Sequence, residues 1–421
     1  MGPVKGRVPR ALRDGKRPGL RLLCGAAAAA LALMLELLPL IRREAPVTLS
    51  LALYPYVPDQ ARFQRAVEAE WRLRHPEVKL DFVAWDCYDR DPPEDLDVFV
   101  YDSIFLYDFL DRGCLLPLAE TDIRDPEDLI PCALSACRAR GSLYAVPQLL
   151  CTNLLFAREG DEAVAGAEDL EALYGLLGDC SDASVPPPEG EGLLVGIDDR
   201  TTLAFWYLET RIDQSRRYSP WDTLPGGEGL DPETMETLEA VQAMAGSEQM
   251  TYVSPDADAY IRGAWFAQGR GRALIGFSEA LWAMGEAADA VTFHRISLSE
   301  GEDIPMLYAD IASVNARIDE KKKPLALELL NIITSRPALT RAFTGDGQNQ
   351  ASQYLLSARW SVYDDLSASD PLYGALKDVV ADPDCRVFLL KRGGRAFQER
   401  ARALFRLPLP RGEAYDLSPA G

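Results

Sequence analysis

The chain has 421 residues, of which 48% are hydrophobic and 26% are charged, and this length allows about two to three ordinary domains. The composition is that of a globular protein and excludes a disordered chain, a collagen and a polytopic membrane protein. The net charge is −21 and is unevenly spread: residues 1–44 hold nine basic and three acidic residues, or +6, so the remainder carries −27. Because an acidic body repels phosphate backbones, no nucleic acid is expected as a partner.

The N-terminus has the pattern of an export signal. Seven basic residues lie between Lys5 and Arg21, and an apolar run from Leu22 to Ile41 follows them before Arg42 and Arg43. A basic leader before such a run directs export, and a run of about twenty residues can just span a bilayer. We expect residues 1–45 to form a hydrophobic helix that is either a removed signal peptide or a membrane anchor through residues 22–41. The body is then secreted or held on the outer face of the cytoplasmic membrane.

Segments typical of strands alternate with segments typical of helices in the first part of the body. The predicted strands are 47–54, 78–85 and 96–101, the predicted helices are 59–75 and 103–113, and an extended stretch is predicted over 143–155.

The second part of the body is predicted to be richer in helices and loops. Loops are expected at 181–192 and 226–231, helices at 232–245, 257–268, 324–334 and 338–343, a short strand at 273–277, a turn at 345–350, and mostly helical structure over 367–406. Strands alternating with helices at this spacing predict an α/β protein with largely parallel sheets. The long extended stretch over 143–155 predicts that the chain crosses between two lobes. A ligand is then expected in the crevice at the C-terminal ends of the strands.

The first candidate for chemistry is a thiol in an apolar run. Cys151 follows the segment from Pro147 to Leu150 and precedes the polar pair Thr152 and Asn153. Such a cysteine is more often an inert core residue, whereas a nucleophile needs a base that forms the thiolate. Seven cysteines follow residue 45, and this odd number leaves at least one thiol unpaired in an exported body. With only two histidines in the chain, zinc is not expected.

The second candidate is a carboxylate directly after a short apolar strand. Glu279 follows the run from Gly269 to Ser278, in which glycines bound the strand. Burial at a strand end would raise the pKa of Glu279 into the range that suits a general base. The alternative is helix capping, in which Ser278 begins a helix over 279–285 and Glu279 favours its dipole.

The third candidate is a recurrence of aromatic and acidic residues at predicted strand ends. Aromatic faces beside carboxylates suit a flat, cationic heterocycle, although each such residue alone is more often structural. The set comprises Tyr54, Tyr56, Asp59, Asp86, Tyr88, Asp102, Tyr260, Tyr308 and Asp310.

These segments together resemble the thiaminase I (thiamine pyridinylase) family over about residues 47–400. The resemblance is carried by 54–59, 95–106, 150–156, 264–279 and 308–310, in this order along the chain. It implies a two-lobed α/β architecture like that of type II periplasmic binding proteins, with a cleft between the lobes. On this basis residues 46–154 and 306–345 are expected to form lobe 1, and residues 155–305 and 346–410 lobe 2.

The resemblance also implies roles for individual residues. Cys151 matches the family's nucleophile and Glu279 its general base. Phe277 stands where the family can carry Tyr, so that one hydroxyl is missing while the ring face remains. The positions that match the pyrimidine-binding set are Tyr54, Tyr88, Asp102, Tyr260, Tyr308 and Asp310.

The implied activity is a thiamine-cleaving transfer, in which another nucleophile replaces the thiazole through a covalent Cys–pyrimidine intermediate. The expected partners are thiamine and a small nucleophile (an amine, a thiol or pyridine), with no cofactor and no metal, and the expected state is a monomer. Two alternatives remain open from the sequence: an extracytoplasmic solute-binding protein for thiamine or a related small molecule, and an inactive relative at the membrane surface. The pair Cys151 and Glu279 separates the enzyme from the binding protein, because a receptor needs no thiol with a base.

Overall fold

The computed structural model describes residues 47–410 except 181–183, 219–223, 226–228, 256–257, 302 and 345–350. The predicted N-terminal helix with its signal or anchor, and the turn expected at 345–350, lie outside the described residues. Within the part of the chain that is described, no helix is both long and apolar enough to cross a membrane.

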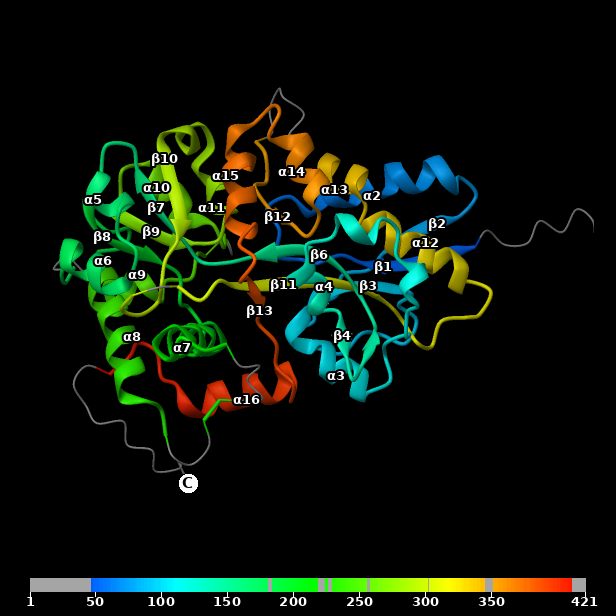
Figure 1. Ribbon diagram of the computed structural model, residues 1–421, viewed down its shortest axis with the longest axis horizontal. Coiled ribbons are helices and arrows are strands. Elements are labelled where there is room, and N and C mark those ends of the chain that lie inside the picture. The colour runs from blue at the N-terminus through cyan, green and yellow to red at the C-terminus, as the bar shows by residue number, and fades with distance from the viewer. Residues whose placement is uncertain are drawn as a thin grey trace, which may run out of the picture. The chain divides into compact units, whose positions relative to one another are not determined.

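Two mixed sheets organise the body (Figure 1). The larger has the order β12-β6-β11-β3-β1-β2, with β13 also paired to β11, and the smaller has the order β10-β7-β9-β8. The strands of the larger sheet are β1 (Thr48–Ala52), β2 (Lys79–Phe82), β3 (Val98–Asp102), β6 (Val146–Cys151), β11 (Met306–Val314), β12 (Leu356–Ser357) and β13 (Arg386–Val387). Those of the smaller sheet are β7 (Leu154–Arg158), β8 (Glu189–Val195), β9 (Gly271–Gly276) and β10 (Val291–Arg295), and a separate hairpin pairs β4 (Arg138–Ala139) with β5 (Ser142–Leu143).

Helices cover both sheets. Around the larger sheet they are α2 (Gln60–Arg74), α3 (Leu106–Asp111), α4 (Pro131–Ser135), α12 (Lys323–Ile333), α13 (Arg336–Phe343), α14 (Trp360–Leu366) and α15 (Pro371–Val380). Around the smaller sheet they are α5 (Glu162–Ala165), α6 (Leu170–Leu177), α7 (Arg200–Ser215), α8 (Pro232–Ala245), α9 (Ser247–Met250), α10 (Ile261–Ala267) and α11 (Ala280–Met284). The last helix, α16 (Gly394–Leu404), packs on α7 and also touches α3 (Figure 1). Short 3₁₀ turns occur at η1 (Ser103–Phe105), η2 (Glu120–Asp122), η3 (Pro126–Asp128) and η4 (Gly285–Ala290).

The prediction of an α/β protein is confirmed, but the expectation of largely parallel sheets is wrong. β1 pairs in parallel with β2 and β3, and β8 with β9, whereas β11 runs antiparallel to both β3 and β6. The reason is the path of the chain: β6 leaves the larger sheet for β7 in the smaller one, and β11 returns from β10. Strands that enter and leave a sheet at the same end must run in opposite directions.

Several elements were not predicted, or differ from the prediction. The extended stretch at 143–155 divides between two sheets, because only Thr152 and Asn153 separate β6 from β7. The segment 367–406 is helical only in α15 and α16, and the helix expected at 257–268 begins at Ile261. The sequence analysis did not predict β8, α7, β10 or β11.

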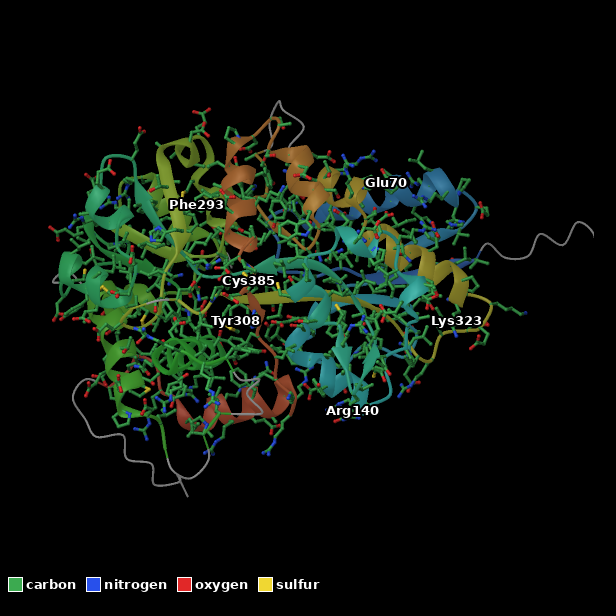
Figure 2. All side chains as sticks on the ribbon, in the orientation of Figure 1. Glu70, Arg140, Phe293, Tyr308, Lys323 and Cys385 are labelled. Atoms are coloured by element: carbon green, nitrogen blue, oxygen red, sulfur yellow. The ribbon has the colours of Figure 1, made fainter. Side chains whose placement is uncertain are left out.

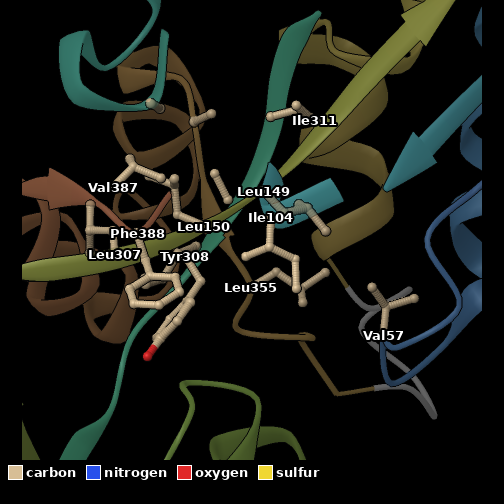
Figure 3. Packing of buried hydrophobic residues seen from close by; sticks show 14 of the residues in the cluster. Val57, Ile104, Leu149, Leu150, Leu307, Tyr308, Ile311, Leu355, Val387 and Phe388 are labelled. Carbon is tan, nitrogen blue, oxygen red and sulfur yellow. The ribbon is translucent and has the colours of Figure 1, made fainter. Parts of the chain in front are cut away.

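The core of the larger sheet lies along its two central strands. All five residues of β3 and all nine of β11 are buried. Figure 3 shows Leu149 and Leu150 of β6 packed near Leu307 and Tyr308 of β11. The ring centroids of Tyr308 and Phe388 lie 5.4 Å apart. Because both central strands are fixed by such packing, the side chains at their ends have defined positions.

Candidate active site

Cys151 is the last residue of β6, at the point where the chain leaves the larger sheet. It is a free, half-buried thiol that pairs across the strand ladder with Tyr308 of β11. Burial first, and then the charges of Asp310 and Glu279, raise the pKa of this thiol well above its usual range. The resting thiol is therefore protonated at neutral pH, and it becomes a nucleophile only if a base takes the proton.

Glu279 approaches from the other sheet, between β9 and α11. Its side chain is buried, and Ser278 Oγ lies 3.4 Å from its Oε2. Burial raises its pKa to about 7, which is the range in which a carboxylate can accept a proton at neutral pH. Glu279 is also the N-cap residue of α11, where the helix dipole favours a carboxylate, although no side-chain hydrogen bond caps this helix.

Two further carboxylates sit side by side in the larger sheet. Asp102 ends β3 and is the ladder partner of Asp310 on β11. Asp102 accepts hydrogen bonds from Tyr88 Oη (2.5 Å) and from the Ile104 backbone N–H (3.0 Å), and burial raises its pKa to about 6. The pKa of Asp310 is also raised, by burial first and then by the charge of Asp102, while a hydrogen bond from Tyr54 opposes the shift.

Tyrosines from neighbouring loops surround these carboxylates. The ring centroids of Tyr54 and Tyr56 lie 5.5 Å apart, and those of Tyr56 and Tyr88 lie 5.8 Å apart, both edge to face. Tyr260, at the start of α10, packs edge to face on Trp282 with centroids 5.7 Å apart. The rings offer apolar faces beside acidic groups, an arrangement that suits a flat cation.

A cavity of about 1000 Å³ collects most of the predicted residues from both sheets. It is lined by Tyr54, Tyr88, Cys151, Tyr260, Phe277, Glu279 and Asp310. Asp102 and Tyr308 are not among the lining residues, but each contacts one: Asp102 accepts a hydrogen bond from the Tyr88 hydroxyl, and Tyr308 is the strand-ladder partner of Cys151. Tyr56, which the sequence analysis placed among the strand-end aromatics, lines the cavity too, while Asp59 instead caps α2.

The contributions of α7 and of Asn153 to the cavity were not predicted from the sequence. Phe205 and Trp206 of α7 line the cavity, as does Asn153. Glu209, one turn further along α7, is buried and accepts hydrogen bonds from Asn153 and from Tyr308. Because α7 was not predicted as a helix, the one sequence signal for Glu209 is that it is an acidic residue within an apolar segment.

No group of three or more His, Cys, Asp or Glu side chains that could hold a metal ion occurs among the residues described.

The fold belongs to the class of periplasmic-binding-protein-like α/β proteins. The maltose-bound MalE3 of T. maritima matches with a TM-score of 0.63 and 15% identity, over 85% of this chain and 93% of that one. At this identity the likeness shows the fold alone.

Closer relatives define the family. The model of the Thiaminase-1 domain matches residues 152–299. Thiaminase-1 of Paenibacillus thiaminolyticus is 44% identical over 344 residues, which cover 82% of this chain and 84% of the relative. The structure of Clostridium botulinum thiaminase I in complex with thiamin matches with a TM-score of 0.82 and 40% identity, over 85% of this chain and 98% of that one. The chain therefore belongs to the thiaminase I family of thiamine base-exchange enzymes (thiamine pyridinylases).

Proposed function

We propose that Cys151 is the nucleophile and Glu279 the general base of a thiamine base exchange in this cavity. The observation that carries the proposal is that the two side chains come from different sheets and line the same cavity. Their electrostatic coupling supports it, because the charge of Glu279 raises the pKa of the thiol. A carboxylate that takes the thiol proton removes this repulsion as the thiolate forms.

The exchange then follows in balanced steps. Thiamine joins an aminopyrimidine to a positively charged thiazolium through one methylene. Glu279 accepts the proton of Cys151, and the sulfur adds to the electron-poor pyrimidine ring, which takes up the electron pair. The methylene–nitrogen bond breaks, its electrons neutralise the thiazolium, and thiazole leaves as a neutral molecule.

A second nucleophile completes the reaction. An amine, a thiol or pyridine attacks the methylene, the ring electrons expel the sulfur of Cys151, and Glu279 returns its proton. Sulfur suits both steps because it is a good nucleophile and a good leaving group.

The remaining predicted residues are proposed to hold the pyrimidine. Asp310 and Asp102 would stabilise protonated or amino-donating states of the pyrimidine as charge shifts during the addition, with Tyr54 and Tyr88 as their hydrogen-bond donors. Phe277 is 43% exposed and offers a ring face at the cavity. Tyr260 lines the wall beside Glu279, while Tyr308 is the strand-ladder partner of Cys151.

Thiamine turnover tests the assignment of Cys151. The full chain and Cys151→Ser are incubated with thiamine and aniline, and thiamine loss is followed by chromatography. We expect exchange by the parent and a loss of at least about 10³-fold in the variant, since a hydroxyl is a far poorer nucleophile at neutral pH. Turnover by the variant at the parent's rate would overturn the nucleophile assignment. Tight thiamine binding without turnover by the parent would favour a solute-binding protein.

The organisation of the chain and its place in the cell are separate parts of the proposal. Residues 46–154 with 306–345 would form lobe 1, and residues 155–305 with 346–410 lobe 2, so that ligand binding closes one lobe on the other. Residues 1–45 would export the protein, as a removed signal peptide or as an anchor through 22–41. Cell fractionation of the full chain and of a version lacking residues 1–45 tests export: the shortened chain should remain in the cytoplasm.

A further inference from the structure

Two buried carboxylates one turn apart on α7 face the two chain segments that connect the sheets. Glu209 and Asp213 are 6% and 1% exposed. Glu209 faces the connection from β6 to β7, and Asp213 faces the connection from β10 to β11. The reaction described above uses neither of them.

One carboxyl oxygen of Glu209 accepts hydrogen bonds from two residues that neighbour Cys151. Its Oε2 accepts a hydrogen bond from Asn153 Nδ2 (2.9 Å) and another from Tyr308 Oη (2.9 Å). Asn153 lies two residues after Cys151 along the chain, and Tyr308 is its partner across the strand ladder. The thiol is thus flanked along the chain and across the sheet by residues that share a single acceptor atom.

The ring of Tyr308 has little freedom apart from this contact. Phe205 and Phe388 pack on it with centroid distances of 5.7 Å and 5.4 Å. Packing restrains the ring, and the bond to Glu209 fixes its hydroxyl end. Figure 3 shows this end of Tyr308 pointing away from the packed cluster of leucines.

The stability of the fold does not explain a glutamate at position 209. Its hydrogen-bond donors Asn153 and Tyr308 are neutral, and no Arg or Lys side chain among the described residues forms an ion pair with it. A carboxyl group buried without a cation costs free energy that an apolar residue of similar volume would not, whether it is ionised or held neutral by a raised pKa. A side chain retained at such a cost suggests a role in the geometry of the site.

We propose that Glu209 is a positioning residue of the exchange reaction, which sets the orientation of Cys151 by holding Asn153 and Tyr308 through one carboxyl oxygen. The proposal rests on the proposed function in one respect, the assignment of Cys151 as the nucleophile. It concerns the length and acceptor geometry of the side chain and not its charge. Burial, and then the charge of Asp213, raise the pKa of Glu209 to about 8, so that the carboxyl is largely neutral at pH 7.

Two conservative variants separate length from charge. Glu209→Gln keeps the length and an acceptor oxygen but has no charge. Glu209→Asp keeps the carboxyl group but is one methylene shorter, which withdraws the oxygen by about 1.5 Å. The shorter side chain cannot hold both donors at hydrogen-bond distance, whereas the amide can.

Asp213 supplies the matched control on the same helix. It accepts hydrogen bonds from the Leu298 and Ile304 backbone N–H groups at 2.7 and 3.0 Å, in the second connection between the sheets. Asp213→Asn alters a buried carboxyl on α7 without touching the neighbours of Cys151. It reports what a loss of local stability does to turnover, since removing the charge of Asp213 lowers the pKa of Glu209 but leaves the length and acceptor geometry of that side chain intact.

The experiment measures kcat and KM for thiamine with aniline at pH 7 for these three variants of the full chain, together with their melting temperatures. We expect Glu209→Asp to lower kcat by about tenfold or more with KM within about threefold, because a misplaced nucleophile slows the chemical step while the cavity wall stays intact. Glu209→Gln should keep kcat within about threefold of the parent, and so should Asp213→Asn even where its melting temperature falls.

The outcomes that would overturn the proposal are distinct. A kcat for Glu209→Asp within threefold of the parent would show that the shared acceptor does not matter. A loss in Glu209→Gln equal to that in Glu209→Asp would assign the effect to charge, and an equal loss in Asp213→Asn would assign it to stability. Cys151→Ser is measured in parallel: if it stays active, the nucleophile assignment fails, and if it is inactive while Glu209→Asp is normal, the positioning role alone fails.

Discussion

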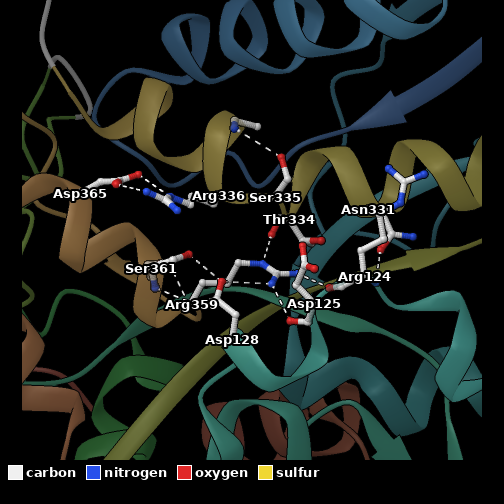
Figure 4. Close-up of polar contacts among 12 residues, drawn as sticks. Arg124, Asp125, Asp128, Asn331, Thr334, Ser335, Arg336, Arg359, Ser361 and Asp365 are labelled. Carbon is white, nitrogen blue, oxygen red and sulfur yellow. Dashed lines mark hydrogen bonds and ion pairs between the residues drawn. The ribbon is translucent and has the colours of Figure 1, made fainter.

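Two buried polar clusters in this molecule differ in the charges they contain: one is built around a cation, and the other consists of carboxyl groups around a thiol. Behind the larger sheet, Arg359 is 2% exposed, pairs with Asp128, and donates hydrogen bonds to the backbone carbonyls of Arg124, Asp125 and Thr334 (Figure 4). At and around the cavity, four carboxyl groups lie near the thiol of Cys151, and the causes of their pKa shifts include no cation. They are Asp102, Glu209, Glu279 and Asp310.

The difference separates a structural cluster from a reactive one. A buried cation surrounded by a carboxylate and carbonyl oxygens holds three segments together: residues 124–128, the end of α12 and the start of α14. Burial without a cation instead raises the pKa of all four carboxyl groups, to about 6 for Asp102, about 7 for Glu279 and about 8 for Glu209, so that these three exchange protons near neutral pH. Tyr308, which donates to Glu209, lies well apart from Lys323 and from the exposed Arg140 (Figure 2).

The largest effect is expected from breaking the paired cluster. Arg359→Met removes the cation that pairs with Asp128, which keeps only its hydrogen bonds from Ser361, and it also removes a donor from three backbone carbonyls. Removing one partner of a buried ion pair costs about 3–5 kcal/mol. Denaturant unfolding should show this loss, while kcat per folded molecule stays the same.

A nearby exposed pair is the control. Arg336 pairs with Asp365 on the same side of the sheet, but its side chain is 54% exposed. Arg336→Met should cost less than about 1 kcal/mol, because an exposed ion pair contributes little. Equal losses for the two variants would mean that burial of Arg359 does not strengthen its cluster.

Replacing the Glu279 carboxyl group at the cavity by a neutral group should have the opposite effect, a loss of activity without a loss of stability. Glu279→Gln is expected to lower kcat by about 10²-fold or more, because the amide cannot take the proton of Cys151. Stability should be unchanged or raised, since a buried carboxyl group becomes an isosteric neutral one. The variant should still bind thiamine in an equilibrium titration. Turnover equal to that of the parent would remove Glu279 from its role.

The sequence predicts those parts of the fold in which local pattern and tertiary environment agree. Helix α2 was expected at 59–75 and occupies Gln60–Arg74, with the Asp59 side chain accepting from the Arg62 backbone N–H at its start. Strand β3 was expected from its apolar run and is buried throughout. In both cases the periodicity of the segment alone determines the element.

The parts that the sequence does not predict depend on contacts between distant segments. β11 is buried on both faces and carries Tyr308 and Asp310 within an apolar run, so that no alternation marks it as a strand. Its antiparallel direction follows from the path between the two sheets and leaves no local pattern. Glu209 depends on α7 packing against Asn153 and Tyr308, which lie 56 and 99 residues away in the chain. The cavity residues themselves were found through a family resemblance that local periodicity could not supply.

The pH dependence of turnover sharpens the contrast between the clusters. Since burial raises the pKa of Glu279 to about 7 and the ionised form is the base, kcat/KM should rise with pH through about 7 and level off above it. Arg336→Met serves as the control, because an exposed pair outside the cleft should leave the profile unchanged. A flat profile between about pH 5 and 9, or one that falls through pH 7, would contradict a base with this pKa.

The smallest effect is expected from adding a neutral hydroxyl to the cleft. Phe277 lines the cavity, is 43% exposed, and its ring centroid lies 6.5 Å from that of Tyr308. Phe277→Tyr should change kcat/KM for thiamine by no more than about threefold, because a partly exposed hydroxyl exchanges a bond to water for one to the substrate. Phe277→Leu is the matched comparison: it removes the ring and should weaken thiamine binding more than the hydroxyl alters it. If an inactive parent became active on Phe277→Tyr, the missing hydroxyl would be essential, and the carboxyl groups and the thiol would not suffice for the reaction.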